Sequence, residues 1–110
     1  MQLEPQALEM PESQRVSIAT TRDPEGRRVG LTFERWTHIK DEHARLAPKM
    51  REILAAVREP YLSVRGRSEH EMWFIAEDAG RFPWLKVVVH YEGGEGWIVT
   101  AFPTNALPSR

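Results

Sequence analysis

Between residues 31 and 60, apolar side chains recur every three or four positions, which is the spacing of one face of an α-helix. The first stripe consists of Phe33, Trp36, Ile39 and His43. It predicts a helix over about 33–45 with Thr32 as its N-cap. The second stripe consists of Met50, Ile53, Leu54 and Val57. It predicts a helix over about 48–58 that stops before Pro60, because the residue before a proline disfavours helical backbone.

After Pro60, apolar and polar positions alternate, which is the period of a β-strand. Strands are predicted at about 61–65, 72–76, 85–91 and 97–102, and the glycine-rich segment 92–96 closes the last two as a hairpin. Before the helices, residues 16–20 and 27–31 flank the turn sequence Asp23-Pro24-Glu25-Gly26. This pattern predicts a further hairpin near the N-terminus.

Together these elements predict an α+β fold. The loops between the four C-terminal strands are too short for crossover helices, so we expect those strands to pair antiparallel. The predicted fold is two N-terminal helices packed on a four-stranded antiparallel sheet, with an extra N-terminal β-hairpin. Residues 14–110 are expected to form a single domain, and residues 1–13, rich in proline and glutamate, a flexible N-terminal arm.

The amino-acid composition limits the cellular locations and the kinds of chemical site that are expected for this chain. The absence of cysteine removes disulfides, thiolate metal sites and cysteine nucleophiles, and it suits a cytoplasmic location. No apolar run is long enough to cross a bilayer, so no membrane association is expected. A net charge of −1 argues against a general nucleic-acid coat protein, but an enzyme needs only a local basic patch.

The motif content argues against a metal or cofactor site. The chain has no glycine-rich phosphate-binding motif preceding a helix. His38 and His43 are five positions apart, which places them about 140° apart around a helix and is unsuitable for gripping one metal ion. We therefore expect neither a metal nor a cofactor.

Four residues are candidates for chemistry or binding, and each has an ordinary structural alternative. His38 on the polar helix face is either a catalyst or a solvated side chain, and His43 is either functional or a partly buried histidine at the helix end. Thr100 is either a hydroxyl donor or an ordinary strand residue. Trp84, in a loop beside Phe82 and Pro83, is a base-stacking candidate. The other tryptophans are better explained as core anchors, namely Trp36, Trp73 and Trp97.

Several segments follow one another in a recognisable order, namely Trp36-Thr37-His38-Ile39, His43, Ile53 to Pro60, Val87-Val88-Val89, and Ile98 to Thr104. In this order the chain resembles the barnase–EndoU–colicin–RelE-like nuclease superfamily, in its branch of small phage- and bacteria-associated toxins. The resemblance covers about residues 31–104. It implies two helices followed by a four-stranded antiparallel sheet, metal-independent cleavage of RNA, and an antitoxin or immunity protein as a partner.

The resemblance also implies roles for residues. His38 and His43 become the first candidates for proton transfer, with Thr100 as a hydroxyl donor or positioning group. Arg65 or Arg67 would clamp the phosphate. The remaining substrate-binding candidates are Trp84, His90 and Thr104. His90 stands where the family commonly has a lysine, and Ala44 where it commonly has a proline, so His90 would offer a cation only when protonated.

Two other functions stay open from the sequence. One is a binding or regulatory module with the same fold and no catalysis, which the acidic net charge and the proline-rich arm favour. The other is a small-ligand pocket lined by Trp73, Phe74 and Trp84. A positive cleft around His43, Arg65 and Thr100 would favour the nuclease over the module.

Overall fold

The computed structural model describes residues 16–78 and 80–108, so the arm predicted at 1–13 lies outside the described residues. The elements run in the order β1 (Ser17–Arg22), β2 (Arg28–Thr32), α2 (Phe33–Glu42), the short 3-10 helix η2 (Ala44–Leu46), α3 (Met50–Arg58), β3 (Leu62–Arg65), β4 (Glu71–Glu77), β5 (Trp84–Glu92) and β6 (Glu95–Thr104). Each of the four C-terminal strands lies close to its predicted range.

The described strands form one six-stranded sheet in the order β1-β2-β6-β5-β4-β3. The pairing of β2 with β6 is parallel and the other pairings are antiparallel. The predicted fold class is therefore wrong, because the sheet is mixed and larger than four strands. The two α-helices of the described chain follow β1 and β2 rather than coming first. The hairpin expected as an extra feature is an integral part of the sheet.

The β1–β2 hairpin joins the sheet through a close contact on β6. Val29 and Gly30 pair with Gly96 and Trp97. A Cβ added to Gly30 would lie 2.7 Å from Cζ3 of Trp97, so only glycine leaves room for the ring at this position. A long connection that includes both helices separates β2 from β6, which is what a parallel pairing requires. Local sequence signals do not report such a distant partner.

The helix boundaries explain a second difference from expectation. Thr32 caps α2 as predicted, its side chain accepting a 3.2 Å hydrogen bond from the backbone N–H of Arg35. The helix ends at Glu42 and not at 45, with His43 as its C-cap. Phe33 was expected on the buried stripe, yet it is 60% exposed. Phe33 is the first residue of α2, directly after the N-cap, and its side chain faces solvent instead of the core.

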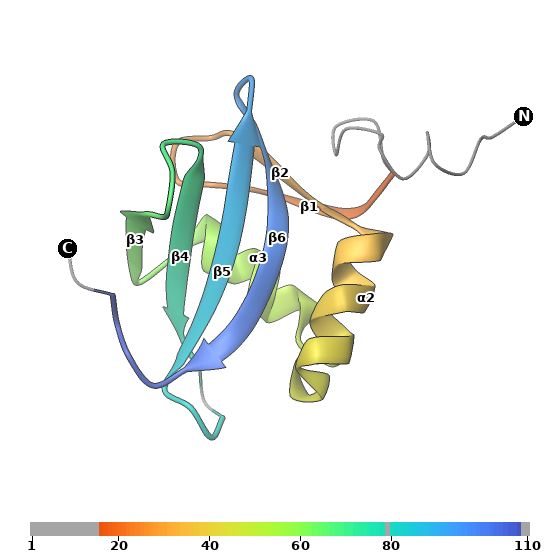
Figure 1. Cartoon of the computed structure of the whole chain (residues 1–110), viewed down its shortest axis with the longest axis vertical. Coiled ribbons are helices and arrows are strands. Elements are labelled where there is room, and N and C mark those ends of the chain that lie inside the picture. The colour runs from red at the N-terminus through yellow and green to blue at the C-terminus, as the bar shows by residue number, and fades with distance from the viewer. Residues whose placement is uncertain (1–15, 79, 109–110) are drawn as a thin grey trace, which may run out of the picture.

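A single core fills the space between the helices and one face of the sheet (Figure 1). Figure 1 shows α3 behind the strands and α2 alongside β6, which agrees with their contacts. Alternation along β5 directs Leu85, Val87, Val89 and Tyr91 into this core. It directs the intervening residues to the opposite face of the sheet, which we call the outer face. These residues are Trp84, Lys86, Val88 and His90.

Candidate functional site

A hollow of about 230 Å³ lies in the middle of the outer face. We call it the central hollow; its lining residues are Arg67, Glu71, Trp73, Lys86, Val88, Thr100 and Phe102. Strand register brings them together, since Val88 pairs with both Trp73 and Thr100, and Lys86 pairs with Phe102. Paired residues on neighbouring strands point to the same face. The hollow is thus built from three adjacent strands and the loop that carries Arg67.

Lys86 is held over an aromatic ring. Its Nζ lies 3.3 Å from the centroid of the Trp73 ring and 5.4 Å from that of Phe102. Burial lowers the pKa of Lys86, the positive charge of Arg67 lowers it further, and the carboxylate of Glu71 acts in the opposite direction. An anion bound in the hollow would offset this destabilisation of the charged ammonium group.

Glu71 has a fixed orientation beside these cations. Its Oε2 accepts hydrogen bonds of 2.7 Å from Nε1 of Trp73 and 3.3 Å from the backbone N–H of Arg67. Gly66 makes this possible, because a Cβ at that position would lie 2.6 Å from both the carboxylate oxygen and Nε1 of Trp73. The carboxylate can accept a proton and is held by two donors.

The central hollow has an excess of positive charge. Arg67 and Lys86 contribute two cations and Glu71 contributes one anion. Among the described residues, neither Arg67 nor Lys86 makes an ion pair within 4.0 Å. Two cations beside a single carboxylate, neither of them in an ion pair within 4.0 Å in the described chain, leave a surplus of positive charge that suits an anion such as phosphate.

A β-bulge places Thr100 in this site. The register of β5 and β6 shifts between Val88, which pairs with Thr100, and Val89, which pairs with Ile98. The extra residue lets Ile98 and Ala101 both face the core while Thr100 faces the hollow. Bulges commonly re-aim a side chain in this way next to functional sites.

The two predicted catalytic histidines lie elsewhere. The ring of His43 is 5.9 Å from that of Phe102, which lines the central hollow, but His43 itself does not line it. His38 is exposed on α2. Because the helix ends at Glu42, the direction of the His43 side chain is set by the C-cap geometry and not by the helical periodicity used to predict it.

The predicted substrate-binding residues are spread over both faces of the sheet. Arg67 lines the hollow, whereas Arg65 pairs with Met72, a residue packed against the core, and therefore projects from the other face. His90 lies on the outer face opposite Glu71, with its ring 6.2 Å from that of His70. The structure thus places His90 at the edge of the site.

Trp84 and Thr104 form a cross-strand pair at the far end of the outer face. Trp84 was predicted in a loop, but it begins β5 and its ring contacts that of Tyr61 at 5.0 Å. Thr104 accepts a hydrogen bond from the backbone N–H of Ala106. Six residues of strand, about 20 Å, separate Trp84 from His90, so these two residues do not share one small site.

Of the residues that line the central hollow, only Arg67 and Thr100 were predicted as nuclease-site residues. The other five were not, namely Glu71, Trp73, Lys86, Val88 and Phe102. Trp73 was assigned to the core, yet it is only partly buried and lies under Lys86. The period of two along β4 and β5 carries a signal for their shared face, but the cross-strand register is needed to bring them together. The predicted small-ligand pocket of Trp73, Phe74 and Trp84 is also wrong. Trp73 and Phe74 are consecutive residues of β4, so their side chains lie on opposite faces of the sheet.

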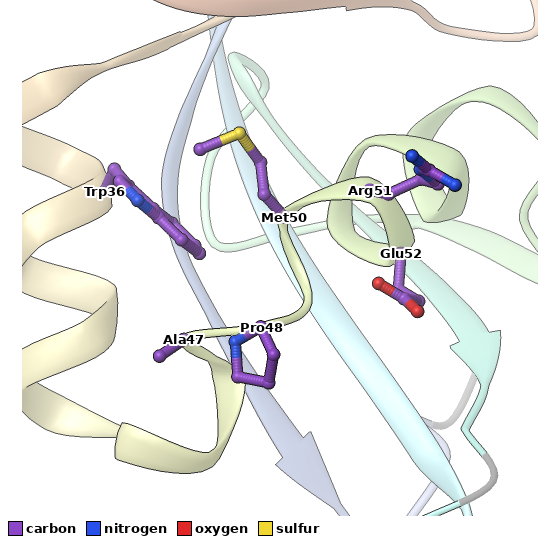
Figure 2. Close-up of a pocket in the computed structure, with 6 residues that line it drawn as sticks. All are labelled: Trp36, Ala47, Pro48, Met50, Arg51 and Glu52. Atoms are coloured by element: carbon purple, nitrogen blue, oxygen red, sulfur yellow. The ribbon is translucent and has the colours of Figure 1, made fainter.

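A second hollow, of about 420 Å³, lies between α2 and α3 (Figure 2). Figure 2 shows Trp36 on α2 and Met50 at the start of α3 on either side of it. Its charged lining residues, Arg51 and Glu52, are exposed and opposite in sign. This interhelical groove has no surplus charge and no hydroxyl beside a proton acceptor, so it is the weaker candidate for chemistry.

Comparison with protein-family models, with curated proteins and with solved structures found no match for this chain. Within residues 16–78 and 80–108, no group of three or more histidine, aspartate or glutamate side chains is placed to hold a metal ion. No helix in that part of the chain is long and apolar enough to cross a membrane. The central hollow is therefore the strongest candidate for a functional site in the described chain.

Proposed function

We propose that this chain is a metal-independent endoribonuclease of the toxin type, and that RNA is cut in the central hollow. One observation carries the proposal. Arg67 and Lys86, without ion-pair partners in the described chain, stand beside the oriented carboxylate of Glu71 and the hydroxyl of Thr100. Cleavage of RNA without a metal needs cations or hydrogen-bond donors for the phosphate, a proton acceptor for the 2′-hydroxyl and an acid for the leaving oxygen, and this set offers the first two.

The proposed reaction is an internal transfer. The carboxylate of Glu71 takes the proton of a ribose 2′-hydroxyl, and the 2′-oxygen attacks the adjacent phosphorus. The bond from phosphorus to the 5′-oxygen of the next nucleotide breaks, and that oxygen takes a proton from an acid. The products are a 2′,3′-cyclic phosphate and a 5′-hydroxyl. Arg67 and Lys86 stabilise the additional negative charge on the phosphorane.

His43 is the proposed acid, since its ring packs against Phe102 at the side of the hollow. In its protonated form it would supply the proton that the leaving 5′-oxygen needs. Thr100 would donate a hydrogen bond to a phosphate oxygen. The partly exposed ring of Phe102 offers a stacking surface for an unpaired base, whereas Lys86 covers one face of the Trp73 ring.

Incubation with total RNA in excess EDTA tests this function. The proposal predicts fragments that end in cyclic phosphate. Activity that disappears in EDTA and returns with a divalent ion would contradict the mechanism.

A binding or regulatory module is the alternative, and one observation favours it: none of the four histidines, all of which lie in the described part of the chain, lines the central hollow. Such a module would bind single-stranded RNA without cutting it. Within the proposal, the chain acts in the cytoplasm, as the lack of cysteine suits, and an antitoxin or immunity protein restrains it by covering the hollow.

A further inference from the structure

A third hollow, of about 420 Å³, lies where the end of α3 meets the edge strand β1. Its lining residues are Thr20, Thr21, Arg22, Arg28 and Arg58. We call it the arginine hollow. It shares no residue with the central hollow, and none of its residues was predicted as a site residue.

The three arginines are not fully neutralised. Arg28 lies 3.6 Å from Glu95, and Arg58 lies 3.9 Å from Glu59, in each case between side chains at least 40% exposed. Exposed pairs at such distances are weak and exchange readily for a better anion. Arg22 donates a 2.8 Å hydrogen bond to the carbonyl of Gly26. Three guanidinium groups therefore face two weakly held carboxylates.

The strand register adds an energetic argument. Arg22 and Arg28 are directly opposite each other on β1 and β2. Like charges in that position destabilise a sheet unless an anion lies between them. Guanidinium forks match the oxygens of a phosphate, and the hydroxyl of Thr20 offers a further donor. The chemistry of the arginine hollow therefore fits a phosphodiester.

The arginine hollow also has a defined relation to the central hollow. A row of paired residues crosses the outer face from one to the other, through Glu71, His90, Trp97, Gly30 and Thr20. Four steps between neighbouring strands span about 19 Å. A single strand of RNA held in the central hollow is long enough to reach the part of the arginine hollow that lies on the outer face, namely Thr20, Arg22 and Arg28.

We propose that the arginine hollow is a second phosphate-binding site, which holds the RNA strand away from the point of cleavage. The inference rests on the proposed function in taking RNA as the polyanion. It does not require that the RNA be cut, because the site contributes affinity and not chemistry.

The test measures binding without cleavage. A fluorescent single-stranded oligonucleotide with 2′-O-methyl riboses lacks the attacking hydroxyl, and its affinity is measured by anisotropy over a range of salt concentrations. Arg28→Gln and Arg58→Gln are each expected to raise Kd roughly tenfold. Each should also reduce the slope of log Kd against log salt by about 0.7, the value for one lost single-strand phosphate contact.

Arg51→Gln is the matched control, since Arg51 is an exposed arginine on α3 beside the interhelical groove. It should leave Kd and the salt slope unchanged. Equal weakening by all three variants, no effect of Arg28→Gln and Arg58→Gln, or absence of RNA binding would overturn the proposal. So would polyglutamate that binds more tightly than RNA and depends on the same arginines, because the site would then suit a protein. Since the oligonucleotide resists cleavage, failure of the nuclease function is a separate result, seen only with natural RNA.

Discussion

Nζ of Lys86 lies 3.3 Å above the centroid of the Trp73 ring, at the centre of the outer face. The ring stabilises the ammonium group without neutralising its charge, as a carboxylate would. Burial and the nearby charge of Arg67 lower the pKa of Lys86, because both destabilise the charged ammonium group. An anion bound beside Lys86 would stabilise that charged form. This pair of residues connects the geometry of the sheet to the proposed phosphate chemistry.

Replacing Lys86 by glutamine should remove the main cation from the central hollow. We expect kcat/KM for RNA cleavage to fall by roughly 10²–10³-fold, the effect of losing one group that stabilises transition-state charge. Lys86→Arg should retain part of the activity. Lys40→Gln is the control, because Lys40 also lies over a tryptophan, 5.4 Å from the Trp36 ring, but outside the hollow. Equal losses in the two glutamine variants would refute the role of Lys86.

Glu71→Gln separates proton transfer from structure. Glutamine keeps an oxygen that can accept the hydrogen bonds from Trp73 and Arg67, but it cannot take a proton at neutral pH. Cleavage should fall by roughly 10²–10⁴-fold while the melting temperature stays nearly unchanged. Glu77→Gln, at the other end of the same strand, should cleave at the wild-type rate. A fully active Glu71→Gln variant would remove Glu71 from the mechanism.

His43→Ala and Thr100→Val test the remaining two roles. His43→Ala should lower cleavage by roughly 10²-fold or more without a change in circular dichroism. Thr100→Val keeps the branched shape and removes only the hydroxyl, so its loss of activity would report hydrogen bonding and not packing. If His43 merely packs against Phe102, its replacement will lower the melting temperature and leave the rate per folded molecule as it was.

The buried carboxylate of Asp23 stabilises the contact between the β1–β2 hairpin and the rest of the sheet. The hydroxyl of Tyr91 donates a 2.7 Å hydrogen bond to Oδ2 of Asp23, and Nε of Arg27 donates to the same oxygen at 2.8 Å. Burial raises the pKa of Asp23, but the hydrogen bonds from Tyr91 and Arg27 outweigh it and hold the pKa below the ordinary 3.8. Burial and the nearby carboxylate raise the pKa of Tyr91, which remains a donor.

A depressed carboxyl pKa stabilises the fold above the unfolded value and loses its effect as pH falls through the folded value. Tyr91→Phe should therefore lower the free energy of unfolding by about 1–3 kcal/mol at neutral pH. The difference from wild type should shrink below about pH 3.8, as Asp23 takes up a proton. Urea titrations at several pH values measure both quantities. A difference that is constant with pH would show that the carboxylate charge plays no part.

Sequence periodicity predicted local structure well and pairing poorly. The N-cap at Thr32, the turn after Asp23 and the last hairpin depend on neighbouring residues, and the structure contains all three. The place of β2 beside β6 depends on a contact between Gly30 and Trp97, which no local pattern reports. For the same reason the sequence named Arg65 or Arg67 and Thr100 as separate candidates, and only the strand register shows that Arg67 and Thr100 line one hollow with Glu71 and Lys86.

The most direct test of the account uses a DNA oligonucleotide that contains a single ribose and carries a 5′ label. In EDTA, the wild-type protein should cut only after that ribose and leave a 2′,3′-cyclic phosphate, because the 2′-hydroxyl is the attacking group. Glu71→Gln and Lys86→Gln should leave the strand intact over the same time. Cutting at deoxyribose positions, cutting that requires a divalent ion, or equal cutting by both variants would contradict the assignment of the central hollow as a ribonuclease site.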